Sequence, residues 1–389
     1  MALTTIQDNN KLVQYSKDIR REYVRENLFS PYMGEGMNSI IRILSETKKG
    51  GEQINVPLIG RLFAEAKSKG TLVGNEESIR NFGHRIYVDW ARHSVATDDA
   101  EEQKDSADVF GEVKPLLSDW GKELQRDEII KALHALPSLS EPAGLSSTNG
   151  QRVNGVLYSA ASAGQKNTWH TDNADRVLYG DAVSNYVAGN HASSLAAITS
   201  GMTFSKSILT LAKRRARKAR PRLRPFRLKD GREYFVAFCG SDAFRDFINS
   251  QDVNDADLHG RAREAGGMNN NPIFQDGDRI LNGVIVREIP EMDELTKVAG
   301  AGAGGIDVAP VFLCGAQALA MPWAREPTPT FRTETDYQFI KGAGVKMCYG
   351  VAKLASKWVE EDSSDEPLKD WGVFTTYVAA VSDAEAASS

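Results

Sequence analysis

Three glycines have the spacing of a phosphate-binding loop. Gly300, Gly302 and Gly305 satisfy the pattern GxGxxG, in which the backbone of a tight turn cradles the pyrophosphate of a dinucleotide. This chemistry needs a buried strand before the glycines and a helix after them, because the helix N-terminus faces the phosphates. Here the charged run DELTKV precedes the glycines, and Pro310 follows closely. We therefore predict a flexible glycine loop that leads into a strand. A nucleotide-dependent enzyme that uses residues 300–305 is kept as an alternative.

A second group contains residue types that bind metals or transfer protons. His170, Asp172 and Asp175 lie together in the run WHTDNAD. No further histidine or carboxylate group stands at a recognisable partner spacing, so we predict a solvated turn. The sequence also lacks a GxSxG elbow for a serine nucleophile and a Walker motif. We therefore predict no enzymatic activity, no cofactor and no metal site.

The cysteines give no sign of a disulfide framework. Cys239, Cys314 and Cys348 are few, odd in number and far apart, and no pair has zinc-ligand spacing. This usage fits a reducing compartment, and we predict buried structural thiols.

A strongly basic run extends from Lys213 to Lys229. It contains ten Lys or Arg residues in seventeen positions and no acidic residue. So many like charges favour an anionic neighbour, because the cations otherwise repel one another. Three interpretations stay open: nonspecific contact with DNA phosphates, contact with acidic segments of a protein, or a solvated surface. The residues expected to face DNA or a partner are Lys213, Arg214, Arg215, Arg217, Lys218, Arg220, Arg222 and Arg224.

The first structural element expected from the sequence is a long hairpin at 49–96. Ile54, Val56 and Leu58 alternate with other residues in the first strand. In the second strand, the period of two places Ile86, Val88 and Trp90 on one face and Arg85, Tyr87 and Asp89 on the other. An isolated hairpin is marginal in water, so this arm needs a surface from the rest of the chain or from a neighbouring subunit.

Other segments have clear helix or strand signals. Apolar residues at helical spacing predict a helix over about 107–136, in which Pro115 fits only in the first turn or at a kink. We predict a hairpin around Asn282-Gly283, a buried strand within 308–324 and exposed loops over 138–168. Further predictions are strands at 234–238 and 373–381, a helix entered at 205 that continues into the basic run, and a short helix at 241–248.

The composition is that of an ordinary globular protein. The chain has 389 residues, of which 41% are hydrophobic and 25% charged, with a net charge of −5. The longest apolar stretch is interrupted by Pro and Gln and is too short for a membrane span, which needs roughly 20 residues. The N-terminus does not resemble a secretory signal, so we expect the chain to stay in the cytoplasm where it is made.

Several segments together resemble the major capsid proteins of tailed bacteriophages, in particular the group typified by coliphage N-four. The first is GNEESIRNFGHRIYVDWARHSV at 74–95, preceded by NSIIRILSETKKGGEQINVPLI. The later segments, in matching order, are NADRVLYGDAVSN at 173–185, RPRLRPFRLKDGREYFVAF at 220–238, NPIFQDGDRILNGVIVREI at 271–289, VFLCGAQALAM at 311–321 and DWGVFTTYVAA at 370–380. The resemblance covers most of residues 35–382.

The resemblance implies an α+β chain with the HK-97 fold that builds an icosahedral shell around double-stranded DNA. The expected parts are an N-terminal arm at 1–48, an extended E-loop hairpin at 49–96, a P domain at 97–195 with its spine helix, an A domain at 196–329 and returning C-terminal strands with a tail at 330–389. The expected partners are other copies of the chain in hexamers and pentamers, a portal, scaffolding or decoration proteins, and packaged DNA, but no membrane. Such a protein resides in the virion and assembles in the cytoplasm of the bacterial host.

The hairpin supplies the expected contacts between subunits, because a strand of about twenty residues reaches roughly 65 Å. Ile86, Val88 and Trp90 are expected to pack on a neighbour, and charged residues are expected to form a polar rim. The full set of contact candidates is Ile54, Val56, Leu58, Arg80, Arg85, Ile86, Val88, Asp89, Trp90 and Arg92. The main alternative function is a DNA-binding accessory protein that uses residues 213–229.

Overall fold

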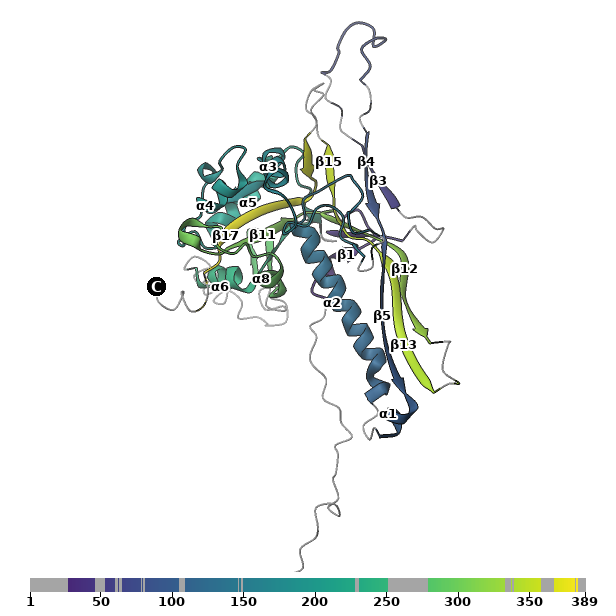
Figure 1. Cartoon of the computed structure of the whole chain (residues 1–389). Coiled ribbons are helices and arrows are strands. Elements are labelled where there is room, and N and C mark those ends of the chain that lie inside the picture. The colour runs from purple at the N-terminus through teal and green to yellow at the C-terminus, as the bar shows by residue number, and fades with distance from the viewer. Residues whose placement is uncertain are drawn as a thin grey trace, which may run out of the picture. The chain divides into compact units, whose positions relative to one another are not determined.

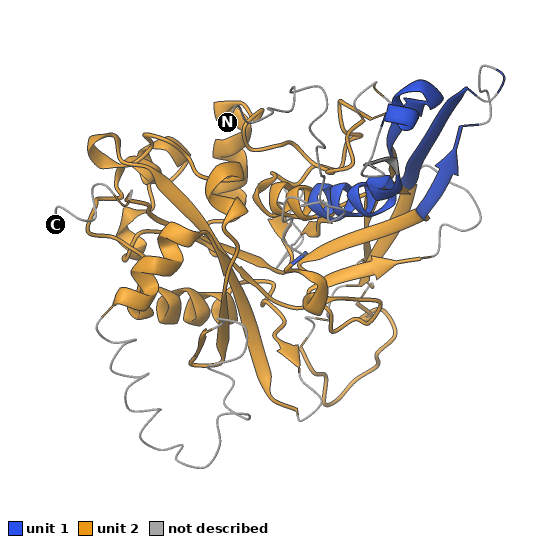
Figure 2. Cartoon of the chain, turned by 90° about the horizontal axis from the view of Figure 1, so that it is seen from below, with its two compact units in different colours: residues 1–27, 91–125, 327–347 blue, residues 28–90, 126–326, 348–389 orange. Residues whose placement is uncertain are grey.

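The computed structural model (Figure 1) describes most of the chain. The described residues are 27–45, 53–59, 62, 65–77, 79, 81–104, 109–145, 147, 150–227, 231–250, 279–332, 337, 339–357, 367–381 and 383. Within them the chain forms two compact units, coloured separately in Figure 2. The described part of the first unit consists essentially of Ala91–Gln125 and Pro327–Met347, and the second unit contains the remainder.

The first unit contains the helix predicted at 107–136. This helix, α2, spans Val113–His134, of which the part up to Gln125 belongs to the first unit, and a 3-10 turn at Val109–Glu112 precedes it. Pro115 lies in the first turn of α2, where its missing N–H costs no helical hydrogen bond. The first unit also contains α1 (Asp99–Lys104). Three strands have residues in both units: β5 (Asp89–Asp98), β12 (Leu319–Phe331) and β13 (Ile340–Tyr349).

These three strands belong to a six-stranded sheet with the order β1-β2-β12-β13-β5 and with β14 beside β12. The remaining members are β1 (Met33–Gly34), β2 (Ile41–Leu44) and β14 (Ala352–Lys353). Strand β2 runs parallel to β12, with Ile41 opposite Leu319, so that chain segments far apart in sequence are joined by backbone hydrogen bonds.

A seven-stranded mixed sheet forms the centre of the second unit, in the order β6-β17-β11-β8-β10-β9 with β7 beside β8. Its strands are β6 (Val177–Tyr179), β7 (Phe226–Arg227), β8 (Glu233–Cys239), β9 (Arg279–Leu281), β10 (Val284–Glu288), β11 (Val308–Cys314) and β17 (Val373–Ala379). Every residue of β11 and β17 is buried, as expected for apolar and β-branched strands covered on both faces.

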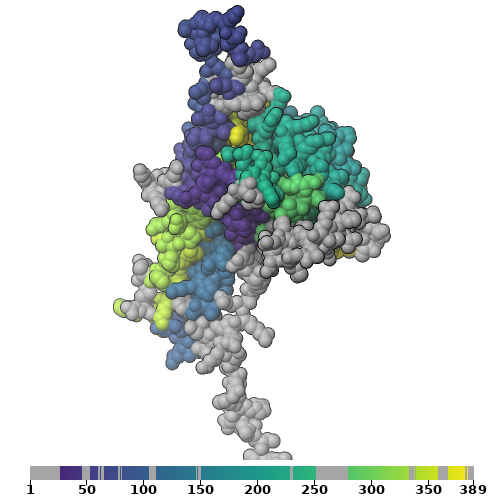
Figure 3. All heavy atoms as spheres, turned by 180° about the vertical axis from the view of Figure 1, so that it is seen from behind, coloured from purple at the N-terminus to yellow at the C-terminus, as the bar shows by residue number. Residues whose placement is uncertain are grey.

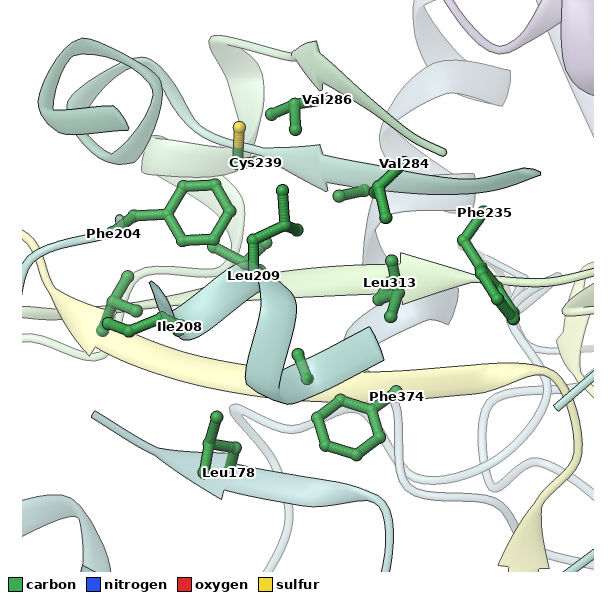
Figure 4. Close-up of a cluster of buried hydrophobic side chains, with 14 of the residues drawn as sticks. Leu178, Phe204, Ile208, Leu209, Phe235, Cys239, Val284, Val286, Leu313 and Phe374 are labelled. Atoms are coloured by element: carbon green, nitrogen blue, oxygen red, sulfur yellow. The ribbon is translucent and has the colours of Figure 1, made fainter. Parts of the chain in front are cut away.

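Helices pack on this sheet and enclose the main hydrophobic core of the second unit. Ile208 and Leu209 of α5 (Lys206–Lys218) lie among Leu313 of β11, Phe374 of β17 and Phe204 (Figure 4). All of these side chains are almost completely buried. Among the described residues, the other helices of the unit are α3 (Ala163–Asp172), α4 (His191–Ala196), α6 (Ser241–Asn249) and α8 (Glu291–Leu295). The 3-10 turns described in it are Ser30–Tyr32, Val183–Asn185 and Ala303–Gly305.

Two small antiparallel pairs complete the second unit. Strand β15 (Ala355–Lys357) pairs with β16 (Leu368–Asp370), and β3 (Gln53–Ile59) pairs with β4 (Asn81–Tyr87). In the described part of the chain, no helix combines the length and the apolar character that crossing a membrane requires.

Several local predictions are confirmed. Asn282 and Gly283, with φ of 50° and 69°, form the turn between β9 and β10, because both positions need the left-handed backbone that Asn and Gly tolerate best. Strands β8 and β17 and helices α5 and α6 also lie where they were expected.

Two local predictions need correction, one in extent and one in substance. The buried strand expected within 308–324 is present as β11, but it does not fill the stretch, since the chain turns between Cys314 and Leu319, with φ of 59° at Gln317, and β12 begins at Leu319. Residues 138–168 are not all exposed loop, because Val153 and Asn154 are buried and α3 begins at Ala163. The apolar residues of this segment have no regular spacing, so the burial of Val153 and Asn154 could not be predicted from the sequence.

Candidate functional site

The predicted hairpin at 49–96 is present as β3 and β4. The two strands pair in antiparallel register, with Ile54 opposite Ile86 and Val56 opposite His84. Along β3, Ile54, Val56 and Leu58 are half-buried while the residues between them are exposed, which confirms the alternation. Ile54 and Val56 pack on a small core of their own chain formed by Leu44, Ile86, Ala320, Ala352 and Leu354.

Polar contacts fix the base of the hairpin. The amide N–H of Tyr87 donates to Asn154 Oδ1 at 2.8 Å, and Asn154 Nδ2 donates to the Tyr87 carbonyl at 2.9 Å. The Ala355 amide of β15 donates to His84 Nδ1 at 3.1 Å. Burial lowers the pKa of His84, so the neutral ring that accepts this hydrogen bond is favoured. Asn154 was missed by sequence reasoning because it lies in a run rich in turn residues.

The alternation breaks after Tyr87. Strand β4 ends there and β5 begins at Asp89, so that Val88 and Asp89 are both buried. Asp89 accepts hydrogen bonds from the Trp90 amide at 2.7 Å and from the Gln151 amide at 3.0 Å. These two bonds hold the Asp89 side chain inward, and Trp90 is 46% exposed. The prediction that Ile86, Val88 and Trp90 share one face is therefore wrong.

The contact candidates thus divide into two groups. Ile86 and Val88 are buried within their own chain, so their side chains are not available to a neighbouring subunit, contrary to expectation. Arg85, Trp90 and Arg92 are exposed. Arg80 lies outside the described residues.

Exposed apolar side chains mark the far half of the hairpin. The described residues from Glu65 to Glu76 are all exposed, and Figure 3 draws this segment in blue. The large apolar side chains of the hairpin and the exposed fractions of their residues are Ile59 71%, Leu62 66%, Leu72 66%, Val73 78% and Ile79 68%. None of the five is among the contact candidates chosen from the sequence, although large apolar residues between two strands are a usable signal.

Helix α5 is amphipathic and contains the first part of the basic run. Its buried face consists of Ile208, Leu209, Ala212 and Ala216, whereas Arg214, Arg217 and Lys218 are exposed. Arg220, Arg222 and Arg224 are exposed in the extended segment that follows. We call the six exposed cations from Arg214 to Arg224 the basic face.

Two cations of the run are used within the chain instead. Arg215 donates to the carbonyl oxygens of Ala174 at 2.7 Å and Val177 at 3.2 Å, and Lys213 donates to the carbonyl of Asn282. Both side chains are half-buried. Further along, Arg227 forms an ion pair with Glu233 at 2.8 Å, and Lys229 lies outside the described residues.

The segment after α5 is held by Asp175 and Arg176. The Arg220 amide donates to Asp175 Oδ2 at 2.8 Å, and the fully buried Arg176 donates to the carbonyl oxygens of Pro221 and Asp370. Burial acts to raise the pKa of Asp175, but Arg176, the Arg220 amide and Lys369 outweigh it, and the pKa is lowered. Asp175 therefore has a structural role rather than the solvated one that was predicted.

His170 is also not in a solvated turn, because it is completely buried. Its Nε2 lies 2.8 Å from the Val187 carbonyl and its Nδ1 lies 2.7 Å from the Tyr179 hydroxyl. Nε2 must donate to the carbonyl, so Nδ1 accepts from Tyr179. The Tyr179 oxygen then accepts from His191 Nδ1 at 2.7 Å, and His191 Nε2 accepts from the Tyr158 hydroxyl at 2.8 Å. This arrangement uses neutral imidazoles.

Burial enforces that neutrality. It lowers the pKa of His170 and lowers the pKa of His191 to about 3. Among the described residues, no group of three His, Cys, Asp or Glu side chains is arranged to hold a metal ion. The rings are linked into a structural network by the hydrogen bonds between His170, Tyr179, His191 and Tyr158.

The glycine pattern has a geometry that does not suit a dinucleotide. The 3-10 turn Ala303–Gly305 leads directly into β11, and the element before the glycines is the short helix α8 rather than a buried strand. The Gly300 amide donates to Asp307 Oδ1 at 2.9 Å, which closes the loop on itself. The predicted loop before a strand is confirmed, and the nucleotide-dependent alternative is contradicted.

The three cysteines are free and buried, as predicted. Burial raises the pKa of the Cys314 and Cys348 thiols, which disfavours the reactive thiolate.

Comparison with known proteins gives a consistent result. A family model described as phage capsid protein matches residues 3–382. The capsid of cyanophage Pam1 is 29% identical, with 98% of this chain and 100% of that chain covered and a TM-score of 0.82. The capsid of Ralstonia phage GP4 is 17% identical, with coverage of 98% and 99% and a TM-score of 0.72. The capsid of Helicobacter pylori bacteriophage KHP30 is 13% identical, with 96% of each chain covered and a TM-score of 0.65. No curated protein sequence matches significantly.

Proposed function

Because the chain belongs to the phage capsid protein family and is a major capsid protein rather than an enzyme, we propose that its copies join into a shell through the β3–β4 hairpin. The observation that carries this proposal is the set of exposed apolar side chains on the hairpin, led by Val73, Leu72 and Ile59. The hairpin corresponds to the E-loop of the HK-97 fold.

Exposed apolar groups of this size favour a partner surface. Burying one Leu or Val side chain contributes roughly 1.5–3 kcal/mol, so several together are enough to dock an arm. The base of the same hairpin is fixed by Asn154, His84 and the core around Ile86, so the chain already positions the arm before a neighbour binds. Pre-positioning lowers the entropy cost of each contact.

The exposed charges beside the arm suit a polar rim. Arg85 and Arg92 are exposed, and rim charges of this kind set register and association rate more than affinity. Each contact can then be individually weak, since many contacts closing together make a shell effectively permanent.

The finer identity belongs to the same proposal. We assign the chain to tailed bacteriophages of the coliphage N-four type, whose shell is built from hexamers and pentamers and encloses double-stranded DNA. The five segments at 1–48, 49–96, 97–195, 196–329 and 330–389 would serve as N-terminal arm, E-loop, P domain, A domain and C-terminal strands with the tail. Portal, scaffolding or decoration proteins would join during assembly in the bacterial cytoplasm.

The basic face is proposed to meet an anion inside the assembly. Arg214, Arg217 and Lys218 project from a helix whose other side is anchored in the core, so their charges are presented on a rigid support. Packaged DNA is the partner that this geometry favours, because repeated cations on one helix face suit nonspecific phosphate contacts. An acidic segment of a neighbouring copy is the alternative.

A double substitution at the hairpin tip tests the assembly proposal. Leu72→Ser with Val73→Ser should leave the subunit folded but lower the yield of closed particles in sedimentation and negative-stain microscopy. The matched control changes two exposed polar residues of the same tip, Lys67→Gln and Lys69→Gln, and should assemble normally. Normal shells from the serine variant would refute the proposed role. A monomer or dimer that binds duplex DNA and never closes into particles would favour the DNA-binding accessory protein.

A further inference from the structure

A cavity of about 490 Å³ in the second unit is not used by any contact discussed so far. It is formed by the last turn of α2, the segment around Tyr158, the first half of α3 and the chain that follows α8. The residues that line it are Lys131, His134, Leu157, Tyr158, Ser159, Lys166, Leu295, Thr296, Lys297, Val298 and Ala299.

The lining of this cavity is cationic. It includes three lysines but no Asp or Glu. Lys297 forms an ion pair with Asp242 at 2.7 Å. Lys166 instead lies over the Tyr158 ring, with its Nζ 4.2 Å from the centroid, and Lys131 is exposed at the end of α2. Two ammonium groups therefore reach the cavity without a carboxylate among its lining residues.

Burial disfavours the charged forms of two groups around the cavity. It lowers the pKa of Lys166. Burial first, and then nearby cationic groups such as Lys353 and Lys166, lower the pKa of His134 well below its ordinary value. An anion in the cavity would relieve both effects, because opposite charges favour the protonated forms of Lys and His.

The geometry also indicates what part of a ligand would be recognised. His134 stacks on the Tyr158 ring at 3.9 Å, and Lys166 lies over the same ring, so this aromatic surface is occupied by the chain's own groups. The groups left to contact a ligand are ammonium nitrogens and the exposed Ser159 hydroxyl. Lysines act as point charges toward phosphate, and hydroxyls donate to its oxygens.

We propose that this cavity binds a phosphate-bearing small molecule through Lys131, Lys166 and Ser159. Two sources share that chemistry, namely free pyrophosphate and the phosphates of a nucleotide. The site lies in residues that belong to one subunit, so binding does not depend on shell formation.

Calorimetric titration of the unassembled subunit with inorganic pyrophosphate tests the proposal. Lys131→Gln with Lys166→Gln should weaken binding at least about tenfold, since each charge-assisted bond contributes that much or more. The control Lys114→Gln with Lys122→Gln makes the same charge change on α2 away from the cavity and should bind normally. The single variant Lys131→Gln, at an exposed position, serves if the double variant fails to fold, and should also weaken binding.

Further titrations identify the ligand and exclude nonspecific binding. ADP that binds with the same dependence on Lys131 and Lys166 would indicate a nucleotide source, and binding of pyrophosphate alone would indicate free pyrophosphate. A variant with Arg214→Gln and Arg217→Gln should retain the site. Equal weakening by the cavity and control variants, loss of binding in the α5 variant, or no heat with either ligand would overturn the proposal while leaving the assembly role untouched.

Discussion

His191 accepts one hydrogen bond and donates another within a buried network of histidine and tyrosine side chains. Its partners are the hydroxyls of Tyr158 at 2.8 Å and Tyr179 at 2.7 Å, and the Tyr179 hydroxyl also contacts His170. Four buried histidines, His84, His134, His170 and His191, have lowered pKa values in the folded subunit. At this scale the side chains serve stability, and their protonation state links that stability to pH.

We expect the free energy of unfolding of the isolated subunit to fall as the pH drops below 6.5. The folded-state pKa of His191 is about 3 and the ordinary pKa of histidine is 6.5, so between these values only the unfolded chain takes up the proton. Each such histidine should cost about 1.4 kcal/mol per pH unit. The variant His191→Phe should be less stable at pH 7 but lose stability less steeply down to pH 4 in urea titrations. Parallel curves for His191→Phe and wild type would contradict this account.

The buried ion pair between Lys353 and Asp370 gives a second prediction. The two groups lie 2.9 Å apart and are almost completely buried, and Trp169 Nε1 donates to the same carboxylate at 3.2 Å. Lys353→Met leaves that carboxylate buried without its cation and should lower the free energy of unfolding by about 3–5 kcal/mol. The double variant Lys353→Met with Asp370→Asn removes both charges and keeps an acceptor for Trp169, so urea denaturation should show most of the loss recovered. Equal losses in the single and double variants would mean that the charge itself is unimportant.

Under the proposed assembly role, the hairpin divides its residues between folding and contact with other copies. Residues near its base, such as Ile86 and His84, are buried in their own chain, whereas Trp90 and the tip present apolar groups outward. Gly350 lies against the Tyr87 carbonyl, where a side chain would collide with the backbone. The base is therefore packed like a domain core, and the exposed residues are left for partners.

Two alanine substitutions should separate these roles. Ile86→Ala removes a fully buried side chain and should cost about 2–4 kcal/mol of subunit stability in urea denaturation. Trp90→Ala removes a side chain that is 46% exposed and should change subunit stability little while lowering particle yield in sedimentation. The division fails if Trp90→Ala forms normal shells or if Ile86→Ala leaves the urea midpoint unchanged.

For the whole molecule, the function is mechanical and depends on repeated weak contacts. The net charge of −5 would oppose contact with DNA if it were spread evenly, but the basic face gathers cations on α5 and the segment after it. A shell that presents this face inward multiplies a modest attraction by its number of copies.

Neutralising part of the basic face should weaken DNA binding in a salt-dependent way. Arg214→Gln, Arg217→Gln and Lys218→Gln together remove up to three phosphate contacts, so the slope of log K against log salt should become shallower by about 2.7. Filter binding of duplex DNA to shells measures that slope. Three exposed lysines elsewhere, Lys67, Lys69 and Lys114, changed to Gln give the same net charge and should keep the wild-type slope. An unchanged slope with unchanged packaging would mean that the basic face meets protein or solvent.

The sequence by itself determined the hairpin, the main helix, the Asn282-Gly283 turn and the buried thiols, because each has a local cause in periodicity, turn chemistry or burial tendency. Its ordered motifs also indicated the capsid family and, through that resemblance, the α+β class. Only the tertiary structure decided that Trp90 faces outward and that His170 and Asp175 are structural. In each case the deciding partner, such as Gln151, Tyr179 or the Arg220 amide, is remote from the residue or is a backbone group whose position no local pattern encodes. The cationic cavity could likewise be recognised only in the tertiary structure, since four separate chain segments supply its lining.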